Sequence, residues 1–192
     1  PALRPEQSRG WELGLEKTAW EGRLVAGLGW AQSRLRDEIY TVYSPSFIAS
    51  PANRTSLSRQ QGLEFTLQAR LPRGWQVDGA WAHLHARENG VAEVRRPADT
   101  GSVSVAWNGA VAGLQASLRY NGGTDDYNFT ASGPPRVRLG AYSLLQLGGH
   151  WRLGTRWELY GRVENALGAR YEDVYTYRMP GTAAYLGLRS AP

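Results

Sequence analysis

Apolar and polar residues alternate through most of this chain, and this period of two limits the folds that it can adopt. In the segment LEFTLQARL, Leu63, Phe65 and Leu67 fall on one face of an extended chain, opposite Glu64 and Thr66. Successive side chains of a strand point to opposite sides, so each such segment has one apolar and one polar face. About nine segments follow this pattern. They predict strands at residues 8–19, 23–43, 59–71, 75–87, 101–108, 113–122, 137–152, 157–166 and 183–190.

The longest uncharged run, residues 100–118, is long enough to be compared with a membrane helix of about 20 residues. It contains Ser102, Asn108 and Gln115, and the segment NGAVAG interrupts it. A spanning helix is therefore not expected here. Spanning strands remain open, because their signal is alternation and not a solid apolar block.

Short and long connections alternate between the predicted strands. The short ones contain WEG, PRG, GAVA and LGTR, and the long ones cover residues 44–58, 88–100, 123–136 and 167–182. In an antiparallel meander all short turns lie at one end and all long loops at the other. Outer-membrane barrels have this asymmetry, with short periplasmic turns and long extracellular loops.

Tryptophan follows the same asymmetry. Five of the eight tryptophans lie within a few residues of a short turn: Trp20, Trp75, Trp107, Trp151 and Trp157. On the meander they are expected to form one belt, as aromatic girdles do at a membrane interface. The pattern as a whole favours an all-β, antiparallel up-and-down transmembrane β-barrel segment. A soluble β-sandwich, whose apolar faces meet in a core, is the alternative.

Composition and local motifs suggest no catalytic or metal site. The net charge of +5 is spread along the chain, so no nucleic-acid partner is expected, and the chain has no cysteine. His83 and His85 share one strand face without a third metal ligand nearby, and they are expected to face outward near the long loops. Asp125 and Asp126 offer too few oxygens for calcium. The alternating charges of 158–164 are expected to line the polar face, with ionic partners from neighbouring strands.

Four stretches of the sequence resemble motifs of the TonB-dependent outer-membrane receptors. The closing segment GRVENALGARYEDVYTYRMPGTAAYLGLR is similar to their last strands, with matches at Val163, Asn165, Leu167, Tyr171, Pro180, Gly181, Tyr185, Leu186, Gly187, Leu188 and Arg189. The opening PALRPEQSRGWELGLE is similar to the family's first motif. The segments SRQQGLEF and RRPADT are similar to two further motifs between them, and the order holds over residues 1–192.

The resemblance implies a function. Such receptors import a scarce nutrient across the bacterial outer membrane, here a ferric siderophore or cobalamin, with energy from TonB. It also implies a barrel of about 22 strands around a plug domain. We therefore expect residues 1–192 to be the C-terminal part of a receptor barrel, without the plug and the N-terminal strands. TonB would act through the plug, outer-membrane lipid would surround the wall, and no enzyme activity or cofactor is expected. A passive porin or a barrel enzyme is the alternative.

The long loops hold the candidate ligand contacts. Tyr127, Phe129, Tyr175 and Tyr177 are aromatic residues in the loops expected to face the outside of the cell. The loop YEDVYTYRMPG is most similar to those of vitamin B12 and catecholate-siderophore receptors. Two departures from the family pattern are the Ser190–Ala–Pro end, where an aromatic residue is usual, and Thr182 after the Pro-Gly pair.

Overall fold

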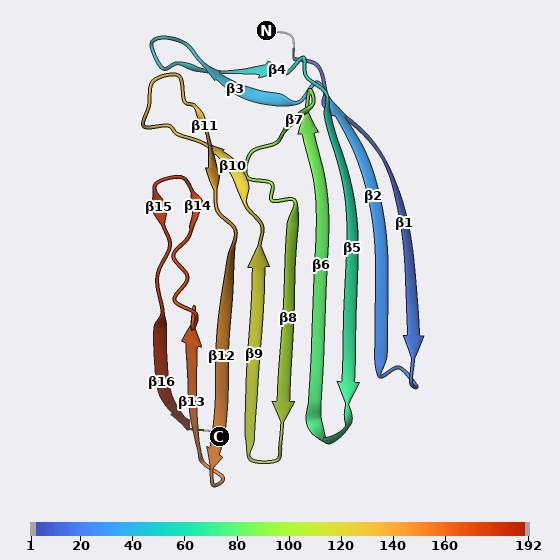
Figure 1. Ribbon diagram of the computed structural model, residues 1–192, viewed down its shortest axis with the longest axis vertical. Coiled ribbons are helices and arrows are strands. Elements are labelled where there is room, and N and C mark those ends of the chain that lie inside the picture. The colour runs from blue at the N-terminus through green and yellow to red at the C-terminus, as the bar shows by residue number, and fades with distance from the viewer. Residues whose placement is uncertain (1–2, 191–192) are drawn as a thin grey trace.

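The computed structural model describes residues 3–190, which form one large antiparallel sheet with small hairpins at one of its ends (Figure 1). Nine long strands follow each other in the order β1-β2-β5-β6-β8-β9-β12-β13-β16, and a short strand, β7, pairs with β6. Their bounds are β1 Gln7–Ala19, β2 Leu24–Arg36, β5 Ser58–Leu71, β6 Trp75–Glu88, β7 Val91–Ala92, β8 Asp99–Asn108, β9 Ala112–Asn121, β12 Tyr142–Leu153, β13 Trp157–Glu164 and β16 Ala183–Ser190. We refer to the nine long strands as the wall. It confirms the predicted up-and-down meander.

Strand register places the apolar residues on one face of the wall. Leu15 pairs with Leu28, Leu28 with Phe65, and Phe65 with Trp81. Residues paired across neighbouring strands point to the same side of a sheet, so these four side chains share a face. The same rule puts Leu13, Leu67, Val105 and Leu159 on that face, as expected. We name this side the apolar face and the opposite side the polar face.

The apolar face is uncovered. Trp11, Leu13 and Leu15 are 77%, 72% and 71% exposed, and the buried apolar residues among 3–190 are Ala69, Ala86 and Leu139. A β-sandwich would bury such side chains between two sheets. The wall instead presents them as a continuous surface, which suits contact with lipid. The described residues contain no helix with the length and hydropathy to cross a membrane.

The short turns all lie at one end of the wall, which we name the turn end (Figure 1). One of them is the 3-10 turn η1, Pro72–Gly74, in which Arg73 and Gly74 both have positive φ. A methyl group added at Gly74 would collide with the carbonyl oxygen of Asn108 at the end of β8. Trp75 and Trp107 are register partners on the apolar face, and their ring centroids lie 6.5 Å apart. Trp151 and Trp157 are on the same face beside the last turn.

Two predicted strands are wrong in their extent. The stretch 23–43 is not one strand, because β2 ends at Arg36 and Asp37 adopts a left-handed φ of 55°. The stretch 137–152 is likewise interrupted at residues 140 and 141. In both cases the chain leaves the wall and pairs locally. The long connections therefore contain hairpins of their own: β3 Ile39–Tyr43 with β4 Ala49–Asn53, β10 Thr124–Tyr127 with β11 Arg136–Leu139, and β14 Glu172–Val174 with β15 Tyr177–Arg178.

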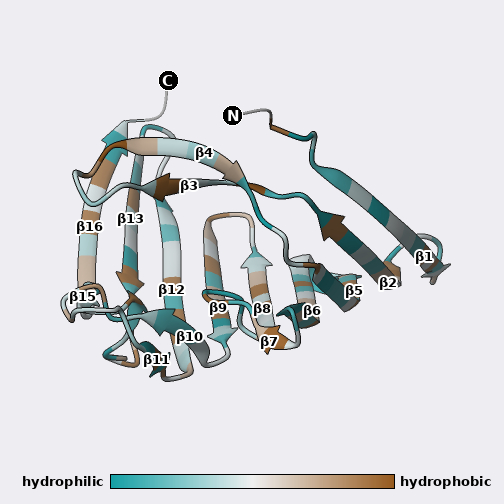
Figure 2. Cartoon of the chain, turned by 90° about the horizontal axis from the view of Figure 1, so that it is seen from above, coloured by the Kyte–Doolittle hydropathy of each residue, from teal (hydrophilic) through white to brown (hydrophobic). Residues whose placement is uncertain are grey.

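Seen from above, the wall is an open arc, and the β3–β4 hairpin extends from β2 across the opening (Figure 2). The other two hairpins, β10–β11 and β14–β15, lie above the ends of the later wall strands (Figures 1 and 2). We name the end of the wall that carries these hairpins the loop end. Any molecule that approaches the polar face from the loop end meets these three hairpins first.

Candidate functional site

One asparagine fixes the base of the β3–β4 hairpin. The side-chain amide of Asn53 donates to the carbonyl oxygen of Asp37 at 2.6 Å and to that of Arg4 at 2.8 Å. Its oxygen accepts a hydrogen bond from the backbone N–H of Arg4 at 2.7 Å. Asn53 therefore links the point where the chain leaves β2 to the segment before β1.

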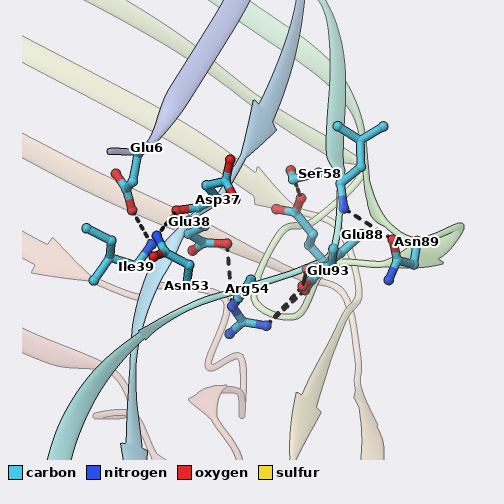
Figure 3. Close-up of polar contacts among 12 residues, drawn as sticks. Glu6, Asp37, Glu38, Ile39, Asn53, Arg54, Ser58, Glu88, Asn89 and Glu93 are labelled. Atoms are coloured by element: carbon cyan, nitrogen blue, oxygen red, sulfur yellow. Dashed lines mark hydrogen bonds and ion pairs between the residues drawn. The ribbon is translucent and has the colours of Figure 1, made fainter. Parts of the chain in front are cut away.

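Carboxylates attach the loops to the polar face of the wall. Arg54 contacts Glu88 of β6 at 3.0 Å and Glu38 at 3.5 Å (Figure 3). Glu93, in the loop after β7, accepts hydrogen bonds from Ser58 and Gln60 of β5. Ser58, Gln60 and Glu88 alternate with apolar-face residues and so belong to the polar face. The loop end therefore folds over the polar side of the sheet.

A second centre of contacts is Asp126 of β10, whose side chain is fully buried. The guanidinium of Arg95 donates to one carboxylate oxygen at 2.7 Å, and the backbone N–H of Tyr175 donates to the other at 2.8 Å. Burial alone would raise the pKa of Asp126, but the hydrogen bonds from Arg95, Tyr175 and Tyr127 hold it below its usual value. One carboxylate thus joins three loops.

The neighbouring Asp125 faces the other side of the β10–β11 hairpin. Arg138 and Arg136 of β11 contact its two oxygens at 3.1 and 3.0 Å. The hydrogen bond from Arg138 lowers the pKa of Asp125, partial burial opposes it, and Arg136 adds to the lowering. Both acids of the TDDYNF segment are therefore bound by arginines. Among residues 3–190, no group of three acids or histidines is close enough to hold a metal ion.

Between the β10–β11 and β14–β15 hairpins lies a cavity of about 580 Å³. Three arginines line it, Arg138, Arg170 and Arg178, together with the aromatic rings of Tyr171 and Tyr175. Glu172 is the one carboxylate in the lining, and Arg178 approaches it only to 4.0 Å. The volume lies within the usual range for small-molecule sites, about 300–1,000 Å³. The lining suits an anionic, partly aromatic ligand.

The four aromatic residues proposed from the sequence occupy different places. Tyr175 is half-buried and lines the cavity. Tyr127 and Phe129 pack edge to face with ring centroids 6.0 Å apart, and Arg136 lies over the Tyr127 ring at 5.9 Å. Tyr177 is 69% exposed and is not part of the cavity lining. Their role as ligand contacts stays a prediction.

Sequence reasoning missed the cationic side of the cavity. Arg138 lies more than 30 residues before Arg170 and Arg178, and only the packing of two separate loops brings the three together. Tyr171 was placed in a family motif, and the structure stacks its ring on Tyr142 at 4.1 Å between centroids. The sequence offered no clear signal for this side, because loops 123–136 and 167–182 together contain four carboxylates and three arginines, and Arg138 lies just outside them.

Below the loops, charged residues line the polar face as predicted. Glu158 of β13 is buried and contacts Arg189 of β16 at 2.6 Å and Arg152 of β12 at 4.0 Å. The partners of Glu158 come from both neighbouring strands, whereas Arg162 and Glu164 pair with each other within β13 at 2.8 Å. His83, on the apolar face, contacts Asp99 of β8 through its Nδ1 at 2.9 Å. His83 and His85 both lie on the apolar face near the loop end and so face outward, as expected.

Comparison with known proteins relates this architecture to one family. A family model for "TonB dependent receptor-like, beta-barrel" matches residues 1–166. Among solved structures, the chain is similar to the pyoverdine outer membrane receptor FpvA of Pseudomonas aeruginosa PAO1 bound to pyoverdine. The TM-score is 0.80 at 17% identity, over 98% of this chain and 30% of that one.

Two further solved structures share the fold. The ferric-catecholate import receptor Fiu of E. coli K12 has a TM-score of 0.76 at 16% identity, over 98% of this chain and 28% of Fiu. A variant of the ferric enterobactin receptor PfeA of Pseudomonas aeruginosa has a TM-score of 0.74 at 24% identity, over 98% of this chain and 32% of PfeA. The chain thus spans about a third or less of the length of these proteins.

Proposed function

This chain belongs to the family of TonB dependent receptor-like β-barrels, and we propose that it forms part of the wall and of the ligand vestibule of an outer-membrane receptor for a ferric siderophore. The family match over residues 1–166 supports a receptor or transporter, and the similarity to FpvA, Fiu and PfeA supports iron chelates as its cargo. The remaining wall, and the part of the receptor through which TonB delivers energy, would come from outside these residues.

The observation that carries the proposal is the arginine-lined cavity. Ferric complexes of catecholate siderophores are anionic and present aromatic rings. Arg138, Arg170 and Arg178 offer positive charge, and Tyr171 and Tyr175 offer flat rings in the same cavity of about 580 Å³. Guanidinium groups form strong charge-assisted hydrogen bonds with anionic oxygens. Cobalamin carries no comparable anionic surface, so the lining favours an iron chelate over it.

The wall would separate lipid from the transport path. Its exposed apolar face would contact outer-membrane lipid, and its polar face would line the lumen. We assign the chain no catalytic role; Glu158, a buried carboxylate of the polar face, is held by Arg189 and Arg152 of the neighbouring strands. Tyr127, Phe129 and Tyr177 would act at the rim of the vestibule, outside the cavity itself.

Uptake by the full receptor tests this function. The receptor that contains this segment is expressed in a strain without its own siderophore receptors, and uptake of ⁵⁵Fe-enterobactin and ⁵⁵Fe-pyoverdine is measured with and without TonB. We expect TonB-dependent uptake of at least one chelate, and a loss of roughly 30-fold in affinity for Arg138→Ala/Arg178→Ala, since each of the two arginines contributes about 1 kcal/mol to an anion contact.

Arg156→Ala is the matched control, because Arg156 lies in a turn at the opposite end of the wall. It should leave affinity unchanged. Uptake of radiolabelled cobalamin, but of no iron chelate, would contradict the siderophore proposal. TonB-independent passage of both iron chelates and unrelated solutes would indicate a passive porin instead.

A further inference from the structure

Tyr142 is a wall residue that does not line the ligand cavity but contacts a residue that does. It begins β12 at the loop end, next to the β14–β15 hairpin (Figure 1). Its register partner is Asn121 of β9, and Asn121 pairs with Thr100 of β8, so the three side chains lie on the polar face. The sheet therefore holds the backbone at Tyr142, whereas the hairpin beside it pairs outside the wall.

Tyr142 holds the segment that leads into the β14–β15 hairpin at two points. Its ring stacks on the ring of Tyr171, with centroids 4.1 Å apart and planes inclined by 30°. Its hydroxyl donates a hydrogen bond to a carboxylate oxygen of Asp173 at 2.6 Å. One side chain of the wall thus fixes two side chains of a loop.

Tyr171 is the residue through which this contact reaches the ligand cavity. Its ring lines the cavity of about 580 Å³, and its carbonyl oxygen accepts a hydrogen bond from the backbone N–H of Met179 at 3.1 Å. That hydrogen bond fixes the backbone but not the ring, which in a loop exchanges between rotamers unless another group packs against it. The stack on Tyr142 selects one orientation of the ring.

A ring that is fixed before the ligand arrives increases affinity. Ordering a side chain on binding costs free energy, and a side chain already held in its bound orientation avoids that cost. The gain applies to ligands that stack on the ring, because aromatic rings interact in specific orientations. An anionic ligand without rings would contact Arg138, Arg170 and Arg178 and would gain nothing from the orientation of Tyr171.

We propose that Tyr142 is a positioning residue of the ligand cavity. It holds the ring of Tyr171 in place and thereby favours aromatic iron chelates over anionic chelates without rings. This role rests on the proposed function in one respect, that the cavity binds an iron chelate. Tyr142 itself does not touch the ligand, and its contact with Asp173 keeps the hydroxyl end of its own ring fixed.

Chelate binding by the full receptor in detergent tests this role. Ferric enterobactin and ferric pyoverdine are the aromatic probes, and ferric dicitrate is an anionic chelate without aromatic rings. Tyr142→Leu should weaken binding of the aromatic probes by roughly fivefold, the cost of ordering one side chain, and change ferric dicitrate binding by less than about twofold. Tyr142→Phe retains the stacked ring and should bind all three within about twofold of the wild type.

Tyr43→Leu is the matched control, because Tyr43 is 67% exposed at the end of β3 and does not line the cavity. It should leave the binding of all three chelates unchanged. Tyr142→Gln, which suits the polar face, replaces Tyr142→Leu if that variant does not insert.

A double-mutant cycle separates positioning from a general loosening of the loop. If Tyr142 acts through Tyr171, Tyr142→Leu should cause no further loss of affinity in a Tyr171→Ala background. Additive losses in the cycle, or an equal loss for ferric dicitrate, would overturn the proposal. So would a loss in Tyr142→Phe as large as that in Tyr142→Leu, because the stacked ring would then not be the cause.

A measurement without ligand separates this role from the proposed function. With Tyr171 replaced by 3-fluorotyrosine, the ¹⁹F chemical shift reports the surroundings of the ring. It should move toward the shift of free fluorotyrosine in Tyr142→Leu but not in Tyr43→Leu. An unchanged shift would overturn the positioning role whether or not a chelate binds. A wild-type receptor that binds no iron chelate contradicts the proposed function, even where the shift moves as expected.

Discussion

Arg95 and Asp126 contact each other at 2.7 Å although 31 residues separate them, and the carboxylate of Asp126 has no exposed surface. The backbone N–H of Tyr175 occupies the second oxygen. The loop before β8, the β10–β11 hairpin and the β14–β15 hairpin therefore share one buried anion. Such a contact orders loops that bury little apolar surface of their own.

The first prediction concerns Asp126→Asn. The neutral amide leaves Arg95 without a counter-charge and replaces one acceptor by a donor that faces the N–H of Tyr175. We expect the free energy of opening the three loops to fall by about 2 kcal/mol, which makes their amide exchange roughly 30-fold faster. Hydrogen exchange with mass spectrometry on residues 122–141 and 169–179 measures it. The carboxylate of Asp125 is partly exposed, so Asp125→Asn should lower the free energy of loop opening by less than about 1 kcal/mol.

The second prediction concerns pH. Hydrogen bonds lower the pKa of Asp125 and Asp126 in the folded loops below the ordinary value of 3.8. Their stabilising contribution is therefore complete above pH 3.8 and is lost as the pH falls through the lowered folded values. Pepsin cleavage of the loops, normalised to an unfolded substrate, should accelerate below pH 3.8 and be unchanged between pH 4.5 and 5.5. Cleavage that accelerates equally in Asp126→Asn would speak against this origin.

A third prediction isolates the base of the β3–β4 hairpin. Asn53→Ala removes three hydrogen bonds that join Asp37 and Arg4 to the hairpin. We expect a local destabilisation of about 1–3 kcal/mol, visible as faster exchange in residues 37–55, with the loops around Asp126 unchanged. Asn128→Ala is the control, because its side chain contacts only Thr130, two residues away. Equal effects of the two variants on residues 37–55 would contradict the assignment.

The fourth prediction compares two adjacent residues of β9. Leu118 lies on the apolar face and Ser117 on the polar face, where its hydroxyl contacts that of Ser104 at 2.8 Å. Leu118→Arg should destabilise the barrel in lipid by about 2–4 kcal/mol, because the charge would face the acyl chains. Ser117→Arg should cost about 1 kcal/mol, the value of the lost hydrogen bond. Urea unfolding of the full receptor in lipid vesicles measures both, and a reversed order would mean that the faces are assigned wrongly.

The period of two predicted the wall well because each wall strand has one polar and one apolar face. It failed where the chain leaves the wall. Residues 39–43, IYTVY, are β-branched and aromatic residues that favour strands, so the composition gave no sign that Asp37 turns the chain into a separate hairpin. The same limit hid residues 140 and 141 between β11 and β12.

The candidate site was less accessible to sequence reasoning than the wall. The segment TDDYNF drew attention to Asp126, but its partner Arg95 lies 31 residues away and belongs to another loop. The arginines of the cavity come from two hairpins whose pairing no local pattern encodes. Contacts between loops depend on tertiary geometry, whereas the two faces of a strand depend only on neighbours in sequence.

The left-handed turn at Asp37 has a consequence for how such a barrel can change over time. A one-residue insertion in β2 would move every following side chain to the opposite face, because the strand period is two. The strands of the β3–β4 hairpin pair with each other and not with the wall. An insertion in the hairpin therefore changes the direction of side chains within the hairpin only. Mutation can lengthen, shorten or rebuild this hairpin while the wall keeps its register.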